Sequence, residues 1–354
     1  MIRPMGFNFY TTQEYFTDLT RRISEAAPGD RVMLATMVFY PEDPAVGRLM
    51  DALRAAARRG VQVSLIVDAY SFLVQGGRRL GPLFFHRTLP ENFSAAFGPV
   101  HAALIGLQSS GGRYAVINVP GRRYSNPIGG RSHIKFAIIN DRIYVGGCNL
   151  DKSTHLDMMT AWDDARTARW LGELAEAMLA TGSARLALEG KDISQGVSES
   201  ASLLVDAGVA GRSLIYEKAL GLIDAAREHI TITCQYFPDF VTTRRLRAAH
   251  SRGVKVEIYY NKPSKHVWPY SVLHYGVEQT SRRELPKSFF VHVVRENLPY
   301  LHAKLIATEQ GAIIGSHNYV SAGITLGTAE IALLNTDPEF ARQAEKTMIE
   351  RVIS

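Results

Sequence analysis

Two stretches of this sequence carry histidine, lysine and asparagine at the same spacing. In each, a lysine follows the histidine by two positions, a glycine by thirteen and an asparagine by sixteen. Imidazole can act as nucleophile, acid or base near neutral pH, while ammonium and amide groups bind phosphate oxygens. We therefore predict one phosphate-ester site formed by both stretches, with six catalytic side chains: His133, Lys135, Asn149, His302, Lys304 and Asn318.

The pattern is specific because it occurs twice. A single His-x-Lys would mean little, because a buried histidine is often only a satisfied core residue. The chain has eleven histidines, and only these two are followed by lysine at the second position. Two matched copies favour a shared function over two coincidences.

Each motif is expected to lie on a strand hairpin. Side chains two apart on a strand point the same way, so the histidine and lysine share one face. The apolar runs at 136–139 and 305–307 would anchor the first strand in the core. Turns at 140–141 and 309–311 would return a second strand, bringing the asparagine beside its own histidine and lysine.

The segments between the motifs also repeat. An apolar strand at 32–39, an amphipathic helix at 47–59 and an apolar strand at 61–70 follow one another, and the same order recurs at 230–261. Strand, helix and strand in series imply right-handed parallel crossovers. We predict an α/β fold of two pseudo-symmetric α/β/α lobes with mixed, mostly parallel sheets.

A polar, glycine-containing stretch at 185–205 separates the two halves. We expect an N-terminal lobe over 1–195 and a C-terminal lobe over 196–354, each with one motif. Tandem independent domains are the alternative. The motifs argue against it, because each resembles half of one site.

Composition narrows the class of protein. Hydrophobic residues make up 46% and charged residues 21% of 354 residues, as in globular proteins. With no long apolar run and no signal-peptide pattern, we expect a cytoplasmic protein. The two cysteines, Cys148 and Cys234, fit a reducing compartment and offer no metal framework, so no metal or cofactor is expected. The net charge of +6 favours anionic partners.

The doubled pattern resembles the signature of the phospholipase D superfamily. The segment CQYFPD at 234–239 also resembles bacterial cardiolipin synthases and related phosphatidyltransferases. The resemblance covers nearly the whole chain. It implies a phospholipase D-like fold and metal-independent phosphodiester cleavage through a phosphohistidine. His133 would be the nucleophile and His302 the general acid and base.

One departure concerns the third residue of the family motif, an aspartate five positions after the lysine. Asn140 and Glu309 stand there, and Asp141 follows one position later. In the family this aspartate is a supporting residue, so the departure bears on efficiency or substrate more than on mechanism. The resemblance also implies that Asp157 and Glu330 hydrogen-bond the catalytic imidazoles, which fixes the tautomer and raises the basicity.

Two segments, 68–93 and 261–277, are predicted to form the rim of the site. Both mix cations with aromatic residues. Such mixtures suit a membrane interface with anionic phospholipid, and they also suit the stacked bases of single-stranded nucleic acid. The predicted substrate-binding residues are Arg131, Gly147, Lys262, Trp268 and Ser316.

Three functions remain open. The favoured one is a phospholipid phosphodiesterase or phosphatidyltransferase at a membrane surface, with peripheral attachment to the inner membrane face as an option. The alternatives are an endonuclease acting on DNA or RNA and a non-catalytic scaffold of the same fold. The sequence does not indicate an oligomeric partner.

Overall fold

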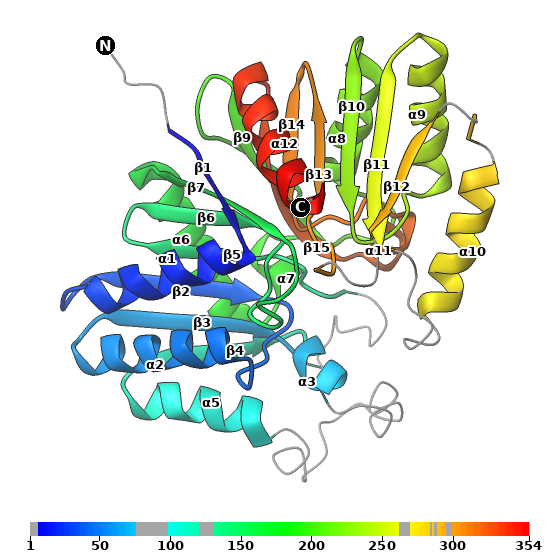
Figure 1. Ribbon diagram of the computed structural model, residues 1–354. Coiled ribbons are helices and arrows are strands. Elements are labelled where there is room, and N and C mark those ends of the chain that lie inside the picture. The colour runs from blue at the N-terminus through cyan, green and yellow to red at the C-terminus, as the bar shows by residue number, and fades with distance from the viewer. Residues whose placement is uncertain are drawn as a thin grey trace, which may run out of the picture.

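The computed structural model describes residues 6–75, 98–119, 130–261, 270–283, 285–286, 289–294 and 299–353. These residues form two lobes that lie side by side, one containing the N-terminus and the other the C-terminal helix (Figure 1). Each lobe is built on one mixed β-sheet flanked by helices. The predicted two-lobe α/β arrangement is therefore confirmed.

The first sheet has the strand order β1-β7-β6-β5-β2-β3-β4. Its strands are β1 (Asn8–Thr11), β2 (Arg31–Thr36), β3 (Gln62–Asp68), β4 (Arg113–Ile117), β5 (Phe136–Ile139), β6 (Arg142–Gly146) and β7 (Met158–Asp163). The helices of this lobe are α1 (Thr12–Glu25), α2 (Pro44–Arg58), α3 (Tyr70–Gln75), α5 (Gly98–Ser109), α6 (Ala165–Thr181) and α7 (Ala184–Ala187).

The second sheet has the order β12-β11-β10-β13-β14-β15-β9-β8. Its strands are β8 (Ile193–Gly196), β9 (Ala201–Ala207), β10 (His229–Cys234), β11 (Lys255–Asn261), β12 (Phe290–Val294), β13 (Leu305–Thr308), β14 (Gly311–Gly315) and β15 (Ala329–Asn335). The helices are α8 (Leu214–Ala225), α9 (Phe240–Ser251), α10 (Tyr270–Arg283), α11 (Ser321–Leu326) and α12 (Pro338–Ile353).

The two sheets repeat one another strand for strand from β1 to β7 and from β9 to β15, with β8 as an additional edge strand. Parallel pairing is confined to β2-β3-β4 and to β10-β11-β12. All other pairs between the strands of the described ranges are antiparallel, so the sheets are mixed but not mostly parallel as the sequence suggested. The reason is that the motif strands return through hairpins, which need no crossover.

The segment between the lobes is more ordered than its composition suggested. The predicted polar linker contains part of α7, all of β8 and most of β9. Strand β8 begins at Ile193 and pairs with β9 in the second sheet, so the predicted division between residues 195 and 196 falls inside a strand of that sheet. The hairpin covers the edge next to β15.

Corresponding helices begin with the same type of residue. The Asp43 side chain accepts hydrogen bonds from two backbone amides at the start of α2. The Asp239 side chain does the same for the amide of Thr242 at the start of α9. A carboxylate at this position satisfies free amides and complements the helix dipole. The aspartate of the CQYFPD segment therefore begins a helix.

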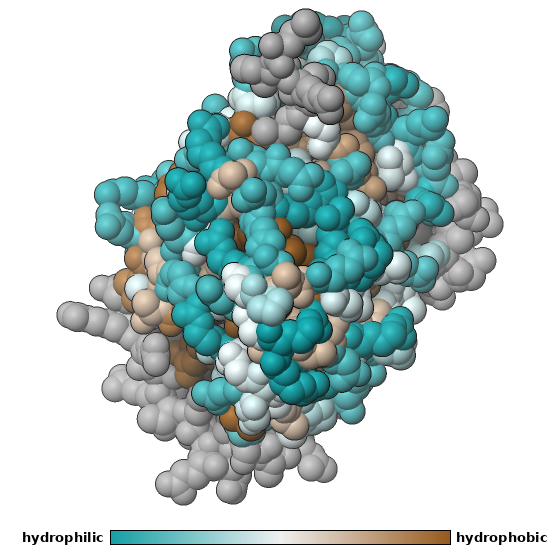
Figure 2. Space-filling view, turned by 90° about the vertical axis from the view of Figure 1, so that its left-hand side faces the viewer, coloured by the Kyte–Doolittle hydropathy of each residue, from teal (hydrophilic) through white to brown (hydrophobic). Residues whose placement is uncertain are grey.

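The core shows how the lobes are joined. Helices α1, α2 and α5 cover the outer face of the first sheet, and α8 and α9 cover that of the second. The inner faces share one apolar cluster, with Phe136 and Ile138 from the first sheet and Leu305 and Ala307 from the second. Helices α6 and α12 contribute to the same cluster, and α12 lies between the lobes (Figure 1). The lobes therefore share a core, unlike independent domains. The outer face of the molecule in Figure 2 is mostly hydrophilic.

The third motif residue has a structural position in both lobes. The Asn140 side-chain oxygen accepts a hydrogen bond from the backbone amide of Arg31, where β2 begins. The Glu309 carboxylate accepts hydrogen bonds from the backbone amides of Arg227 (2.7 Å) and His229 (3.3 Å), where β10 begins. Both side chains lie at the ends of β5 and β13 that are remote from the motif histidines. Asparagine and glutamate both accept such bonds, which explains why aspartate is not required.

Glu309→Ala is therefore expected to lower stability and leave catalysis nearly intact. Removing the acceptor of several backbone hydrogen bonds should lower the free energy of unfolding by about 1–3 kcal/mol. Urea unfolding followed by circular dichroism measures this, with the exposed Glu199→Ala as a matched control. A large loss of turnover with unchanged unfolding would place Glu309 in the chemistry instead.

Candidate active site

Each motif histidine is attached by its backbone to the opposite half of the chain. The His133 amide donates a hydrogen bond to the carbonyl of Ala329 (2.7 Å), and the His302 amide donates to the carbonyl of Leu156 (2.7 Å). Two isolated parallel bridges accompany these bonds, Ser132 with Ala329 and Leu156 with Leu301. The backbone thus crosses between the lobes on both sides of one site.

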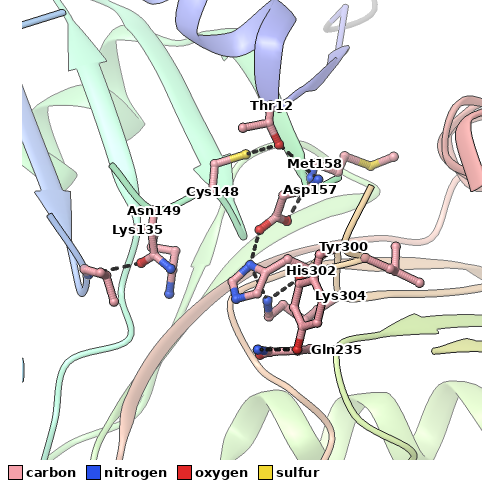
Figure 3. A network of polar contacts seen from close by, with 12 residues as sticks. Thr12, Lys135, Cys148, Asn149, Asp157, Met158, Gln235, Tyr300, His302 and Lys304 are labelled. Carbon is pink, nitrogen blue, oxygen red and sulfur yellow. Dashed lines mark hydrogen bonds and ion pairs between the residues drawn. The ribbon is translucent and has the colours of Figure 1, made fainter. Parts of the chain in front are cut away.

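The crossing pairs each imidazole with a carboxylate from the other lobe. His133 Nδ1 lies 2.9 Å from Glu330 Oε2, and His302 Nδ1 lies 2.5 Å from Asp157 Oδ2. Figure 3 shows Asp157 directed at the His302 ring. A carboxylate at Nδ1 holds the ring proton there, so the Nε2 lone pair is free for a substrate. The resemblance implied these carboxylates as partners, and the structure shows that the pairing is crosswise.

Burial sets the charge of these pairs. It lowers the pKa of His133 to about 4 and that of His302 to about 3, and the adjacent lysines act in the same direction. Burial alone would raise the pKa of both carboxyls. Lys304 and His302 instead bring the pKa of Asp157 to about 2, and His133 does the same for Glu330. At neutral pH the imidazoles are neutral and the carboxylates ionised.

The two motif lysines are completely enclosed. Lys135 is 0% exposed and Lys304 is 1% exposed. Lys135 Nζ donates to the carbonyl of His133 (2.8 Å), and Lys304 Nζ donates to the carbonyl of His302. Within the described residues, neither ammonium has a carboxylate oxygen at ion-pair distance. Buried cations without a direct counter-ion are costly, so the pair is suited to an anionic ligand.

The activity should decline above about pH 7 because of Lys135. Burial lowers the pKa of its ammonium to about 7. A lysine with a lowered pKa is charged only below that value, so alkaline pH removes a phosphate-binding cation. We expect kcat/KM to fall as pH rises through 7 and the fall to move to higher pH in Lys135→Arg, which stays charged. Equal alkaline limbs in both proteins would exclude Lys135 as the titrating group.

The side chains of the two motif asparagines, Asn149 and Asn318, differ in their contacts. The Asn149 side-chain oxygen accepts a hydrogen bond from the amide of Val38 (3.2 Å), which orients its NH2 group. In Figure 3, Asn149 lies with Lys135 on one side of the site, and His302 and Lys304 lie on the other. The Asn318 side-chain oxygen is buried and has no hydrogen-bond partner among the described residues. The Asn149 NH2 group can therefore donate to a ligand, while Asn318 keeps an acceptor that is unpaired within the described ranges.

The residue after the motif glycine differs between the two histidine–carboxylate pairs. A Cβ atom at Gly147 would lie 2.1 Å from Asp157 Oδ1, so only glycine leaves room for that carboxylate. The equivalent Ser316 donates its hydroxyl to Glu330. Both residues were predicted to bind substrate, and the structure places them against the carboxylates. The carboxylate that holds His133 therefore accepts a serine hydroxyl, whereas His302 Nδ1 lies 2.9 Å from Lys304 Nζ in addition to its contact with Asp157.

The sequence of this chain matches a model of a known protein family. The family model described as "Cardiolipin synthase, PLD-like domain" matches residues 19–179 and 220–352. This chain belongs to the phospholipase D-like family. Among curated proteins, none matches the sequence significantly.

Solved structures show the same phospholipase D-like fold. Phosphatidylserine synthase from Haemophilus influenzae Rd KW20 superposes with a TM-score of 0.70 at 14% identity, over 98% of this chain and 86% of that one. Polyphosphate kinase from Porphyromonas gingivalis superposes with a TM-score of 0.56 at 14% identity, over 99% of this chain. This chain matches 50% of the kinase.

Two further polar residues position the histidines of this phospholipase D-like chain. Asp68 accepts a hydrogen bond from the amide of Ser132 (2.8 Å), and Asn261 accepts one from the amide of Leu301 (2.9 Å). Asp68 ends β3 and Asn261 ends β11, the second strand of the repeated strand–helix–strand unit in each lobe, and each holds the residue before a histidine. Sequence reasoning missed both, although a polar residue ends this strand in both copies of the repeat.

The predicted phosphate ligand Arg131 belongs to this supporting layer. Its side chain is 5% exposed, and its Nη1 atom lies 3.7 Å from Asp68 Oδ1 and donates to the carbonyl of Asn118. These contacts balance the buried Asp68 charge. Of the other predicted substrate ligands, Lys262 and Trp268 lie outside the described residues.

In the described part of the chain, no group of three or more histidine, cysteine, aspartate or glutamate side chains could hold a metal ion. No helix in these ranges has both the length and the apolar character needed to cross a membrane.

Proposed function

We propose that this chain is a phosphodiesterase or phosphatidyltransferase that acts on phospholipids through a phosphohistidine. One observation carries the proposal. Two buried imidazoles, each held by a carboxylate of the opposite lobe, lie beside two buried ammonium groups that have no ion pair with any residue the structure describes. This arrangement provides a nucleophile, an acid and an oxyanion site around one phosphorus atom.

In the first step, His133 Nε2 attacks phosphorus. The P–N bond forms as the P–O bond to the leaving alcohol breaks, and His302 gives its Nε2 proton to that alcohol oxygen. The diester brings negative charge that offsets the ammonium groups lowering the pKa of His302, so this imidazole takes up a proton on binding. Asp157 stabilises the imidazolium.

In the second step, His302 removes a proton from water or an alcohol. The resulting oxygen attacks phosphorus, the P–N bond breaks, and its electron pair returns to His133. Lys135, Lys304 and the two amides bind the non-bridging oxygens in both steps. Water as acceptor gives hydrolysis, and an alcohol gives transfer.

Phospholipid is the favoured substrate class for two reasons. The matching family model is described as a cardiolipin synthase domain, and a structural neighbour is a phosphatidylserine synthase. A phospholipid substrate would place the protein at a membrane surface, and we propose peripheral attachment at the cytoplasmic face. The positive net charge supports attraction to anionic lipid.

The test offers the purified protein two substrates in the presence of EDTA. These are phosphatidylglycerol vesicles, with lipid products separated, and a labelled single-stranded oligonucleotide. Lipid turnover that disappears in His133→Ala supports the proposal, and cardiolipin or phosphatidic acid as product separates transfer from hydrolysis. Oligonucleotide cleavage with intact lipid would establish the nuclease alternative. Turnover abolished by EDTA would contradict the metal-independent mechanism.

A further inference from the structure

Two large apolar side chains lie next to each other on the surface at the start of α9. Phe240 is 46% exposed and Val241 is 44% exposed. The other large apolar side chains that are exposed in the described ranges, Ile105, Leu186 and Leu326, lie on three separate helices. Single exposed apolar residues need no explanation, whereas apolar side chains gathered at one point are typical of an interaction surface.

The exposed side of α9 continues with positive charge. Three exposed arginines follow the apolar pair on the same side of the helix: Arg244, Arg245 and Arg247. No acidic residue occurs within α9. Arg245 Nη1 lies 2.6 Å from Asp224 Oδ2 of α8, so part of the Arg245 charge is offset. We call the two apolar residues and the three arginines the α9 face.

Polar contacts at the start of the helix keep the α9 face outward. The Asp239 carboxylate accepts hydrogen bonds from the backbone amide of Thr242 (2.9 Å) and from the Tyr216 hydroxyl (2.7 Å). The inner side of the helix is buried and consists of Thr242, Thr243, Leu246 and Ala249. The packing of α9 on the lobe therefore uses its other side and leaves the apolar pair directed at solvent.

The α9 face begins at the edge of the second sheet that carries the candidate site. Strands β10 and β13 are antiparallel, with Thr233 opposite Leu305. The carboxyl end of β10 therefore lies beside the end of β13 that follows His302. Residues 235–239 connect this end of β10 to α9. Figure 1 shows α9 on the side of the second lobe that is turned away from the first.

The corresponding helix of the first lobe lacks this combination. Helix α2 also follows a capping aspartate, but a proline and the buried Ala45 stand in place of the apolar pair. Asp51 stands in place of Arg247, so the charge of α2 is mixed. The fold itself therefore requires neither the exposed apolar pair nor the uniform positive charge of α9.

We propose that the α9 face docks on an anionic membrane surface, with Phe240 and Val241 entering the interface and the arginines contacting lipid phosphate groups. Apolar side chains gain free energy on leaving water, and arginines are attracted to an anionic bilayer. Nucleic acid is the less suitable partner, because Val241 offers no ring on which a base could stack. The inference rests on the proposed function for the phospholipid substrate. It goes further by assigning the surface that meets the membrane.

Vesicle sedimentation tests the docking without turnover. The protein is sedimented with mixed phosphatidylglycerol–phosphatidylcholine vesicles and, separately, with phosphatidylcholine vesicles, and it should bind the anionic ones more tightly. Binding to the anionic vesicles is expected to fall about 10-fold in Phe240→Ser and about 3- to 5-fold in Arg244→Gln. High salt should remove the effect of Arg244→Gln and leave that of Phe240→Ser.

Matched controls lie outside the α9 face. Ile105→Ser on α5 and Arg48→Gln on α2 alter exposed side chains of the same types, so both variants should bind within about two-fold of wild type. The inference would be overturned if wild type did not bind anionic vesicles, if Phe240→Ser bound them like wild type, or if the controls lost as much binding. A Phe240→Ser defect confined to a single-stranded oligonucleotide would make this a nucleic-acid surface instead.

Turnover separates this inference from the proposed function. The ratio of turnover on vesicles to turnover on dispersed, short-chain phosphatidylglycerol should fall about 10-fold in Phe240→Ser. A general folding defect lowers both rates and leaves their ratio unchanged, so an unchanged ratio would contradict docking by the α9 face. If the wild-type protein cleaves neither substrate, the proposed function is wrong, and sedimentation still decides whether the α9 face binds a membrane.

Discussion

His133→Ala and His302→Ala are each expected to reduce phospholipid turnover by about four orders of magnitude or more. In the proposed mechanism, the first removes the atom that bonds to phosphorus, and the second removes the proton donor and acceptor. Both imidazoles are 8% exposed, so thermal unfolding should accompany the kinetics to show that the variants are folded. Initial rates on phosphatidylglycerol vesicles provide the measurement.

A substrate with an activated leaving group separates the two roles. A p-nitrophenyl phosphodiester needs little protonation when its alcohol departs, so the first step should survive largely in His302→Ala and be lost in His133→Ala. A burst of nitrophenol from His302→Ala, with a trapped phosphoenzyme, is the expected result. The opposite pattern would exchange the roles of nucleophile and acid.

Glu330→Gln and Asp157→Asn are expected to lower turnover by about two to four orders of magnitude. An amide NH2 directed at Nδ1 would turn the ring into the tautomer that carries its proton on Nε2, and this tautomer cannot attack phosphorus. Glu330→Gln should therefore abolish the nitrophenol burst. Asp157→Asn should retain part of it, because it acts on the imidazole that the activated substrate needs least.

A matched control is available outside the site. Glu345 Oε2 lies 3.2 Å from His229 Nε2, which is also a histidine–carboxylate pair. Glu345→Gln breaks this pair without touching the candidate site, so turnover should stay within a few-fold of wild type. If Glu345→Gln caused the same loss as Glu330→Gln, the effect would be one of stability rather than of tautomer.

The repeat could be predicted because it depends on local order along the chain. The hairpin that follows each motif lies where the sequence placed it, but β5 begins at Phe136, so His133 and Lys135 precede the strand instead of lying on it as predicted. The crosswise pairing with Glu330 could not be predicted this way. It depends on how the two sheets pack, and no periodicity in either half reports that packing.

Two other differences between the sequence-based predictions and the structure have similar causes. Asn140 and Glu309 departed from the family motif because this position needs only a hydrogen-bond acceptor for a neighbouring strand. Arg131 was predicted to bind substrate. Its partner Asp68 lies 63 positions earlier, at the end of β3, and only the folded chain brings the two together.

The crosswise pairs also determine when the protein can become active during its own synthesis. Glu330 is 197 positions after His133, and at ribosomal speeds this separation lasts roughly 10 to 40 s. Throughout that interval the emerging chain contains the proposed nucleophile, His133, without the carboxylate that holds its ring. A chain that stops before β15 would carry an unprepared His133. Under the proposed mechanism, a translation product interrupted before Glu330 should therefore be inactive toward phosphodiesters.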